Sequence, residues 1–205
     1  MKKSRPAEFA QLYFDQDMTE AELLQVADGY AAVFSARCPG KESPNEDSAA
    51  VIPFDEHSAV LVVADGLGGN AAGELASRMT IEAISEAINE ARDSGVMLRS
   101  AIINGIEQAN AAVQALGTGA ATTVAAVEVL DGLVRPYHVG DSSILMFGGG
   151  GKIKLDTGSH SPVGYAVEAG VIDERDALHH DELHLISNMV GAPDMRIEVG
   201  ALRTL

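Results

Sequence analysis

Cysteine is almost missing from this chain of 205 residues, in which Cys38 is the only one. No disulfide can therefore form within the chain, and no cluster of cysteine thiolates can bind zinc. Tryptophan is absent and aromatic residues make up only 4%, so the core has to be built from Ala, Val, Ile and Leu. Long apolar runs are also missing, because no uncharged apolar stretch is long enough to span a bilayer, which takes roughly 20 residues. The basic start is not followed by the apolar segment of a secretory signal, and we expect a cytoplasmic protein.

Basic residues are scarce as well. The chain has 14 Lys and Arg against 30 Asp and Glu, which gives a net charge of −16 at pH 7. Such a chain would be repelled by nucleic acid and by anionic membranes, so we expect neither as a partner. Two roles for the charge stay open: it keeps the protein in solution, or it attracts cations and basic segments of a substrate.

The length of the chain fits one domain. Residues 1–28 mix charges with short apolar stretches and are predicted to be an appendage, followed by a domain over residues 29–205. Within the appendage, Thr19 and Glu22 have the spacing of a capping box and predict a short helix. Residues 30–36 are expected to form the first strand of the domain. The apolar run over residues 58–64 predicts a strand that is buried on both faces and ends at Asp65.

Helical periodicity follows this strand and then changes to a β pattern. Apolar residues recur at helical spacing over residues 73–92 and 98–116, so each segment is predicted to be a helix that covers a sheet with one side. Strands are predicted over residues 122–130 and 133–139, where Asp131 and Gly132 form a strong hairpin signal. A second pair is predicted around the four glycines at 148–151. Helices thus lie between early strands and a late meander, which indicates an α+β fold.

Acidic residues stand beside the expected strands. Glu46 and Asp47 follow a loop, while Asp65 and Asp141 stand where an apolar run gives way to glycine. Carboxylates gathered from separate strand ends repel one another unless a divalent ion neutralises them, which predicts a metal-assisted reaction at one edge of a sheet. Because Glu46 and Asp47 are adjacent, an extended chain points them to opposite sides, and only one can bind a given ion directly. Capping of a turn is the other interpretation of Asp65 and Asp141, and it stays open.

Together with further short segments, these stretches resemble the metal-dependent serine/threonine protein phosphatases of the PPM or type 2C family. The matching segments are residues 45–47, 63–69, 73–77, 119–123, 138–142, 159–161 and 167–170. The resemblance implies an antiparallel β-sandwich with a helical pair against each sheet, in α-β-β-α layers. It also implies hydrolysis of phosphoserine and phosphothreonine in phosphorylated protein substrates.

The resemblance implies roles for individual residues as well. It makes Asp47 and Asp65 metal ligands, with Asp65 bridging two ions, Gly66 completing one shell through its carbonyl and Glu46 holding a coordinated water. Asp141 becomes a ligand of a third, weaker ion. The catalytic group is then Glu46, Asp47 and Asp65, and in the complete domain two or three Mn²⁺ or Mg²⁺ ions generate the attacking hydroxide. No nucleophile from the protein is required.

The chain departs from the family pattern in two places. Relatives carry an arginine shortly before the Asn-Glu-Asp segment that grips the substrate phosphate, and here Arg37 or Lys41 would take its place. Relatives also continue beyond the equivalent of Gly200 with two further metal aspartates, which do not occur before Leu205. We therefore expect a domain that is incomplete at its C-terminus, either as part of a longer protein or as a degenerate relative. A non-catalytic domain that binds a phosphoprotein or a regulator is the alternative to an enzyme.

The histidines allow more than one interpretation. His138 is expected to be a strand residue, while His160 in the matched Ser-His-Ser segment serves either a structural hydrogen bond or catalysis. His179, His180 and His184 lie in an acidic segment without cysteine, which favours a surface flap over a zinc site.

Overall fold

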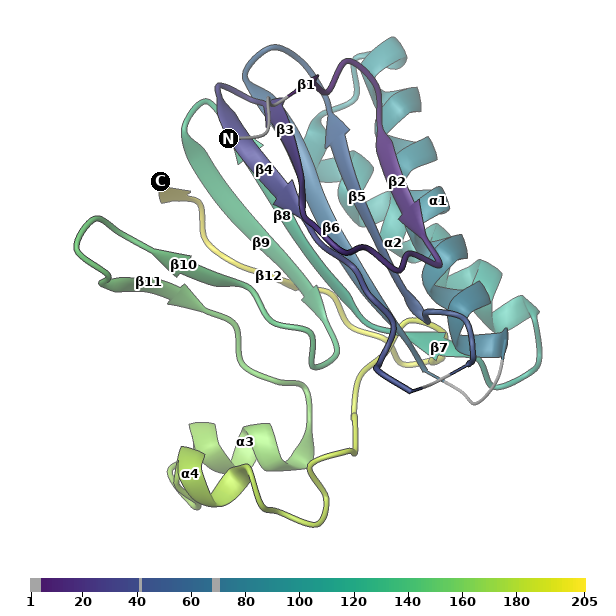
Figure 1. The fold of residues 1–205 in the computed structure, drawn as a ribbon, viewed down its shortest axis with the longest axis vertical. Helices are drawn as coiled ribbons and strands as arrows, with labels where there is room; N and C mark the ends of the chain where they lie inside the picture. The colour runs from purple at the N-terminus through teal and green to yellow at the C-terminus, as the bar shows by residue number, and fades with distance from the viewer. Residues whose placement is uncertain (1–4, 41, 68–70) are drawn as a thin grey trace.

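The fold is built around one large antiparallel sheet. The computed structural model describes residues 5–40, 42–67 and 71–205. In the described residues the sheet has eight strands, of which six follow one another in the order β12-β9-β8-β6-β5-β2, while β7 pairs with β6 and β13 with β9 (Figure 1). The strands are β2 (Gln11–Phe14), β5 (Asp47–Pro53), β6 (Ser58–Leu67), β7 (Ala121–Thr122), β8 (Val124–Leu130), β9 (Leu133–Val139), β12 (Glu198–Val199) and β13 (Arg203–Thr204).

Two long helices, α1 (Ala71–Ser94) and α2 (Leu98–Ala115), cover one face of this sheet (Figure 1). Their apolar residues recur every three or four positions, so each helix buries one stripe. Ile84 and Ile88 of α1 and Ile102 and Ile106 of α2 are fully buried and belong to one core cluster with Val62 of β6. This packing holds β5 and β6 rigidly where their ends carry Asp47 and Asp65.

Gly105 lets the two helices approach closely. A Cβ atom placed on Gly105 would lie 2.8 Å from the Cα atom of Ile84 in α1. Real Cβ atoms do not come so close to backbone, so the crossing of α1 and α2 depends on the missing side chain.

A smaller sheet packs on the other face of the large one. It contains β1 (Arg5–Pro6), β3 (Glu22–Val26) and β4 (Gly29–Val33), in the order β1-β3-β4 (Figure 1). Leu24 of β3 and Ala31 of β4 form a second buried cluster with Val51 of the large sheet. Near the end of the sheet that is formed by β9 and β12 lie the hairpin of β10 (Leu145–Phe147) and β11 (Ile153–Asp156) and the short helices α3 (Pro162–Glu168) and α4 (Glu174–Ala177) (Figure 1).

The long helices and both late hairpins are confirmed. The mixed architecture, a large antiparallel sheet flanked by helices, agrees with the expected fold class. Of the four expected layers, the described residues form three, because α3 and α4 lie away from the smaller sheet and leave it without a helical cover (Figure 1). None of the helices in the described ranges is both long and apolar enough to cross a bilayer.

The helix predicted from Thr19 is wrong. Residues 22–26 form β3, which pairs with β4 through a two-residue turn in which Ala27 and Asp28 have φ angles of 48° and 61°. Both central residues of such a turn need positive φ, as in tight β-hairpins. Burial of Leu24 between the two sheets stabilises the strand, whereas a capping box satisfies only local groups. The predicted division at residue 28 thus falls inside a hairpin, and β2 from the predicted appendage is an edge strand of the large sheet.

Candidate metal and phosphate site

Two aspartates face each other at one end of the large sheet. Asp47 begins β5, Asp65 lies near the end of β6, and the two residues are partners in the antiparallel register of these strands. Both line a cavity of about 470 Å³, together with Ser142 and Ser143 from the segment after β9. We call this the carboxylate cavity. The structure therefore brings together acidic residues that are 18 positions apart in the sequence.

The backbone of Asp65 is held from the neighbouring strands by two threonines. Its N–H donates to the Oγ1 atom of Thr123 (3.0 Å), and its carbonyl accepts from the N–H of Thr123 (2.9 Å) and the hydroxyl of Thr122 (2.8 Å). These three bonds use only backbone groups of Asp65, so its carboxylate is available to the carboxylate cavity, where it faces Asp47. The position of that carboxylate is thus set by the fold.

Glu46 and Gly66 are held against the start of α1. The carbonyl of Glu46 accepts from the N–H of Gly66 (3.1 Å) and from the hydroxyl of Ser77 (2.6 Å). A Cβ atom on Gly66 would lie 2.1 Å from the carbonyl oxygen of Gly73, so only glycine fits there. A Cβ atom on Gly73 would lie 2.8 Å from the Gly66 carbonyl oxygen and 3.2 Å from Oε1 of Glu46. These two oxygens therefore approach the same part of the helix start.

The acidic side chains repel one another. The pKa of Asp65 is raised to about 6 by burial and, next, by the negative charges of Asp47 and Asp141, with a smaller contribution from Glu46. Because Asp65 is also exposed to solvent, its desolvation is incomplete, and repulsion by the neighbouring carboxylates is the stronger cause. A divalent cation fits this donor set, because oxygen ligands with uncompensated negative charge are what Mg²⁺, Mn²⁺ and Ca²⁺ prefer.

Asp141 lies in the turn after β9, on the side of Asp65 away from Asp47's strand. Its side chain is exposed, and its charge reaches Asp65. The next residue, Ser142, shares a hydrogen bond of 2.5 Å between its Oγ atom and Oγ1 of Thr123. Thr123 thus joins the turn of Asp141 to the backbone of Asp65.

Arg37 lines a second cavity of about 150 Å³, which also has Glu46, Asp47 and Asp65 in its wall. Its guanidinium donates to the carboxylate of Asp17 through Nη2 (2.8 Å) and Nε (3.2 Å). This ion pair lowers the pKa of Asp17, chiefly through the hydrogen bond. Lys41, the other residue expected to bind phosphate, lies outside the described residues.

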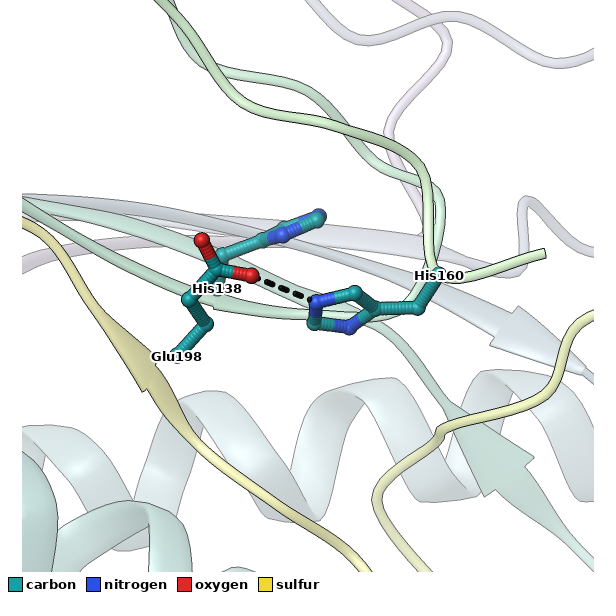
Figure 2. A group of neighbouring side chains, drawn as sticks. All are labelled: His138, His160 and Glu198. Atoms are coloured by element: carbon teal, nitrogen blue, oxygen red, sulfur yellow. Dashed lines mark hydrogen bonds and ion pairs between the residues drawn. The ribbon is translucent and has the colours of Figure 1, made fainter. Parts of the chain in front are cut away.

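A group that the sequence did not connect lies at the edge strand β12. Among the His, Cys, Asp and Glu side chains of the described ranges, only those of His138, His160 and Glu198 bring three ligand atoms within 4.8 Å of one another (Figure 2). His138 is a strand residue of β9, as expected, and His160 does make structural hydrogen bonds, one of them to Glu198. Glu198 lies opposite His138 because β12 pairs with β9, and these strands are far apart in the sequence. A local sequence pattern therefore could not predict this contact.

Comparisons with known sequences agree with the expected family. Residues 36–188 match the family model for protein phosphatase 2C. A Streptococcus pyogenes protein described as "protein phosphatase 2C-type" is 30% identical over 172 residues, which cover 78% of this chain and 69% of that protein. Protein phosphatase PhpP of Streptococcus pneumoniae is 28% identical over 141 residues, which cover 66% of this chain and 57% of PhpP. The chain thus spans 57% to 69% of the length of these relatives.

Solved structures share the fold. The serine/threonine phosphatase of Streptococcus agalactiae superposes with a TM-score of 0.71 at 23% identity, covering 96% of this chain and 75% of that one. The catalytic domain of the serine/threonine phosphatase PstP, solved with two manganese ions, gives a TM-score of 0.58 at 22% identity over 95% of this chain and 72% of its own.

Proposed function

This chain belongs to the protein phosphatase 2C family, and on that premise we propose that it hydrolyses phosphoserine and phosphothreonine in protein substrates with the help of divalent cations. The observation that carries the proposal is the pair Asp47 and Asp65, set opposite each other in the sheet with the pKa of Asp65 raised toward neutrality. A site with this much repulsion favours a bound cation. The names of the related proteins supply the reaction class.

A complete domain of this family would hold two or three Mn²⁺ or Mg²⁺ ions, and the residues of this chain would contribute to them in the following way. Asp47 and Asp65 would ligate ions in the carboxylate cavity, the carbonyl of Gly66 would add a neutral oxygen, and Asp141 would take a more weakly held ion. When bound, such ions lower the pKa of water and neutralise the charge of phosphoryl oxygens. Glu46, whose backbone is anchored to Ser77 and Gly66, would keep its carboxylate in place to accept a hydrogen bond from water near the site.

Arg37 is the described residue best placed to hold the substrate phosphate, because it lines a cavity with Asp47 and Asp65. Its present partner Asp17 is exposed, so exchanging that carboxylate for a phosphate costs little. A guanidinium binds phosphate through two parallel N–H groups, which favours arginine for this task over lysine. Lys41 remains the alternative from the sequence, and the cytoplasmic location also stays a prediction.

The experiment is a phosphate-release assay with a phosphothreonine peptide and Mn²⁺. We expect release by the wild type that a chelator stops and that Asp65→Asn reduces by at least about 100-fold, as for a group acting on the transition state. Asp93→Asn is the matched control, because Asp93 is an exposed residue of α1 outside the site. Wild-type protein that binds Mn²⁺ and the peptide but releases no phosphate would favour the non-catalytic alternative.

A further inference from the structure

His160 makes two hydrogen bonds to Gly140, the residue before Asp141, and they use both the N–H and the carbonyl of Gly140. The N–H of Gly140 donates to Nδ1 of His160 (3.1 Å), and the N–H of His160 donates to the carbonyl of Gly140 (2.9 Å). The side chain of His160 is buried. These bonds connect two segments that are 20 residues apart, at the residue directly before Asp141.

Two further side chains orient the ring of His160. Asn188 donates from Nδ2 to Nδ1 of His160 (2.9 Å), and its amide is itself oriented by the backbone of Arg196 through bonds of 2.8 and 3.0 Å. On the opposite side of the ring, Nε2 lies 2.9 Å from Oε2 of Glu198 (Figure 2). Because two N–H groups share the single lone pair of Nδ1, this nitrogen is an acceptor, and the proton of the ring is on Nε2, from which it is donated to Glu198.

We propose that His160 is a positioning residue, whose ring, oriented by Glu198 and Asn188, fixes the turn of Asp141 and Ser142 beside Asp65. The other side of this turn is bounded by Thr123, since a Cβ atom on Gly140 would lie 2.6 Å from Cγ2 of that threonine. Thr123 in turn bonds to Ser142 and to the backbone of Asp65. The turn is therefore held between His160 and the end of β6.

The same geometry argues against a metal ion bound by His138, His160 and Glu198. An ion on Nε2 of His160 would require the proton to move to Nδ1, where the N–H groups of Gly140 and Asn188 already point. A metal-ligating histidine normally donates its other N–H to an acceptor, and here that nitrogen accepts instead. By distance and angle, neither ring nitrogen of His138 makes a hydrogen bond within the described residues, although the backbone of Ser142 is close enough to favour the charged ring. Burial, with His160 as the next cause, outweighs this and lowers the pKa of His138. His138 is thus a neutral packing partner, with its ring centroid 4.3 Å from that of His160.

Two variants of His160 distinguish the role of the acceptor atom Nδ1 from that of the rest of the ring. The Oδ1 atom of His160→Asn stands where Nδ1 stood and can still accept from Gly140, whereas His160→Gln reaches toward Glu198 and offers no acceptor at that point. Hydrogen exchange of the Gly140 amide, followed by NMR, should stay slow in the wild type and in His160→Asn. It should become faster by about tenfold in His160→Gln, the loss expected for one hydrogen bond. The amide of Ala126, in the middle of β8, reports on the whole fold and should exchange equally in all three.

The wild type alone gives an independent test if a variant does not fold. In protein labelled with ¹⁵N-histidine, we expect Nε2 of His160 to carry the proton and Nδ1 to be unprotonated, with no change in the His138 and His160 signals when Zn²⁺ is added. A proton on Nδ1, zinc bound through these rings, or unchanged Gly140 exchange in His160→Gln would each overturn the proposal.

The consequence for the cations rests on the proposed function and is measured separately. By calorimetry, Mn²⁺ affinity should fall about tenfold in His160→Gln, as for the loss of a group that orients a metal ligand, and should be largely retained in His160→Asn. If the wild type bound no Mn²⁺, the proposed function would fail, while the exchange of Gly140 would still decide the role of His160.

Discussion

The protonation of Asp65 affects the free energy of unfolding, because its carboxyl group lies in the proposed cation site. Its pKa is raised to about 6 by burial and by Asp47 and Asp141, compared with about 3.9 for an aspartate in an unfolded chain. The folded protein therefore binds this proton more tightly than the unfolded chain. The contribution of Asp65 to the free energy of unfolding is most favourable below the unfolded pKa, decreases as the pH rises from about 4 to about 6, and stays low above that.

We therefore predict that Asp65→Asn raises the melting temperature of the metal-free protein at pH 7.5, because the amide removes the repelled charge. The difference in melting temperature should shrink to zero below about pH 4, where Asp65 is protonated in both the folded and the unfolded protein. Thermal unfolding in a chelator at a series of pH values measures it, with Asp93→Asn as the control. Excess Mn²⁺ should reverse the order, since it binds the wild type more tightly and stabilises it more than the variant. A variant that melts lower than wild type at pH 7.5 without metal contradicts this account of the site.

Arg37 gives a second prediction at the level of one side chain. If its guanidinium holds the substrate phosphate, Arg37→Ala should lower kcat/KM by roughly 10- to 100-fold, equivalent to about 1.5 to 3 kcal/mol for a charged hydrogen bond. Arg37→Lys should recover part of this, because it keeps the charge without the fork. Asp17→Asn, which only frees the arginine, should leave kcat/KM equal or higher. If kcat/KM is unchanged in Arg37→Ala, Arg37 does not hold the substrate phosphate and another group must do so.

At the scale of elements, local patterns predicted what local interactions determine. The period of the isoleucines marked α1 and α2, and the Asp131-Gly132 turn has the positive φ angles, 49° and 74°, that its sequence favours. The segment after Thr19 could not be predicted in this way, because β3 exists through its pairing with β4 and through Leu24 packing between two sheets. Tertiary contacts outweighed a local helix signal there.

The contact between α1 and α2 can be tested at Gly105. Replacement of glycine by alanine in a helix normally stabilises by up to about 1 kcal/mol. Here the new Cβ atom would lie 2.8 Å from the backbone of Ile84, so we expect Gly105→Ala to destabilise the protein by about 1 to 3 kcal/mol. The neighbouring exposed residue provides a control, as Asn104→Ala should be neutral or slightly stabilising. Urea denaturation of both variants measures the difference, and equal stability would show that the helices can move apart at no cost.

At the scale of the whole molecule, the site combines groups that sequence reasoning could connect with groups it could not. Asp47 and Asp65 were expected to meet because acidic residues beside neighbouring strands lie at one edge of a sheet. The pairing of Arg37 with Asp17 and the bonds from Glu198 through His160 to Gly140 depend on how distant segments pack. No spacing along the chain encodes them, and only the folded structure places Glu198 next to the turn of Asp141.

Calorimetric titration of Mn²⁺ into the wild type and Asp65→Asn tests the central claim most directly, because the claim is that Asp47 and Asp65 hold a cation. We expect measurable though weak binding to the wild type and to Asp93→Asn. Affinity should be lower by at least about tenfold in Asp65→Asn, since even groups that only orient metal ligands contribute roughly 10- to 100-fold. Equal affinity in the wild type and Asp65→Asn would contradict the assignment of the cation site and, with it, the proposed phosphatase mechanism.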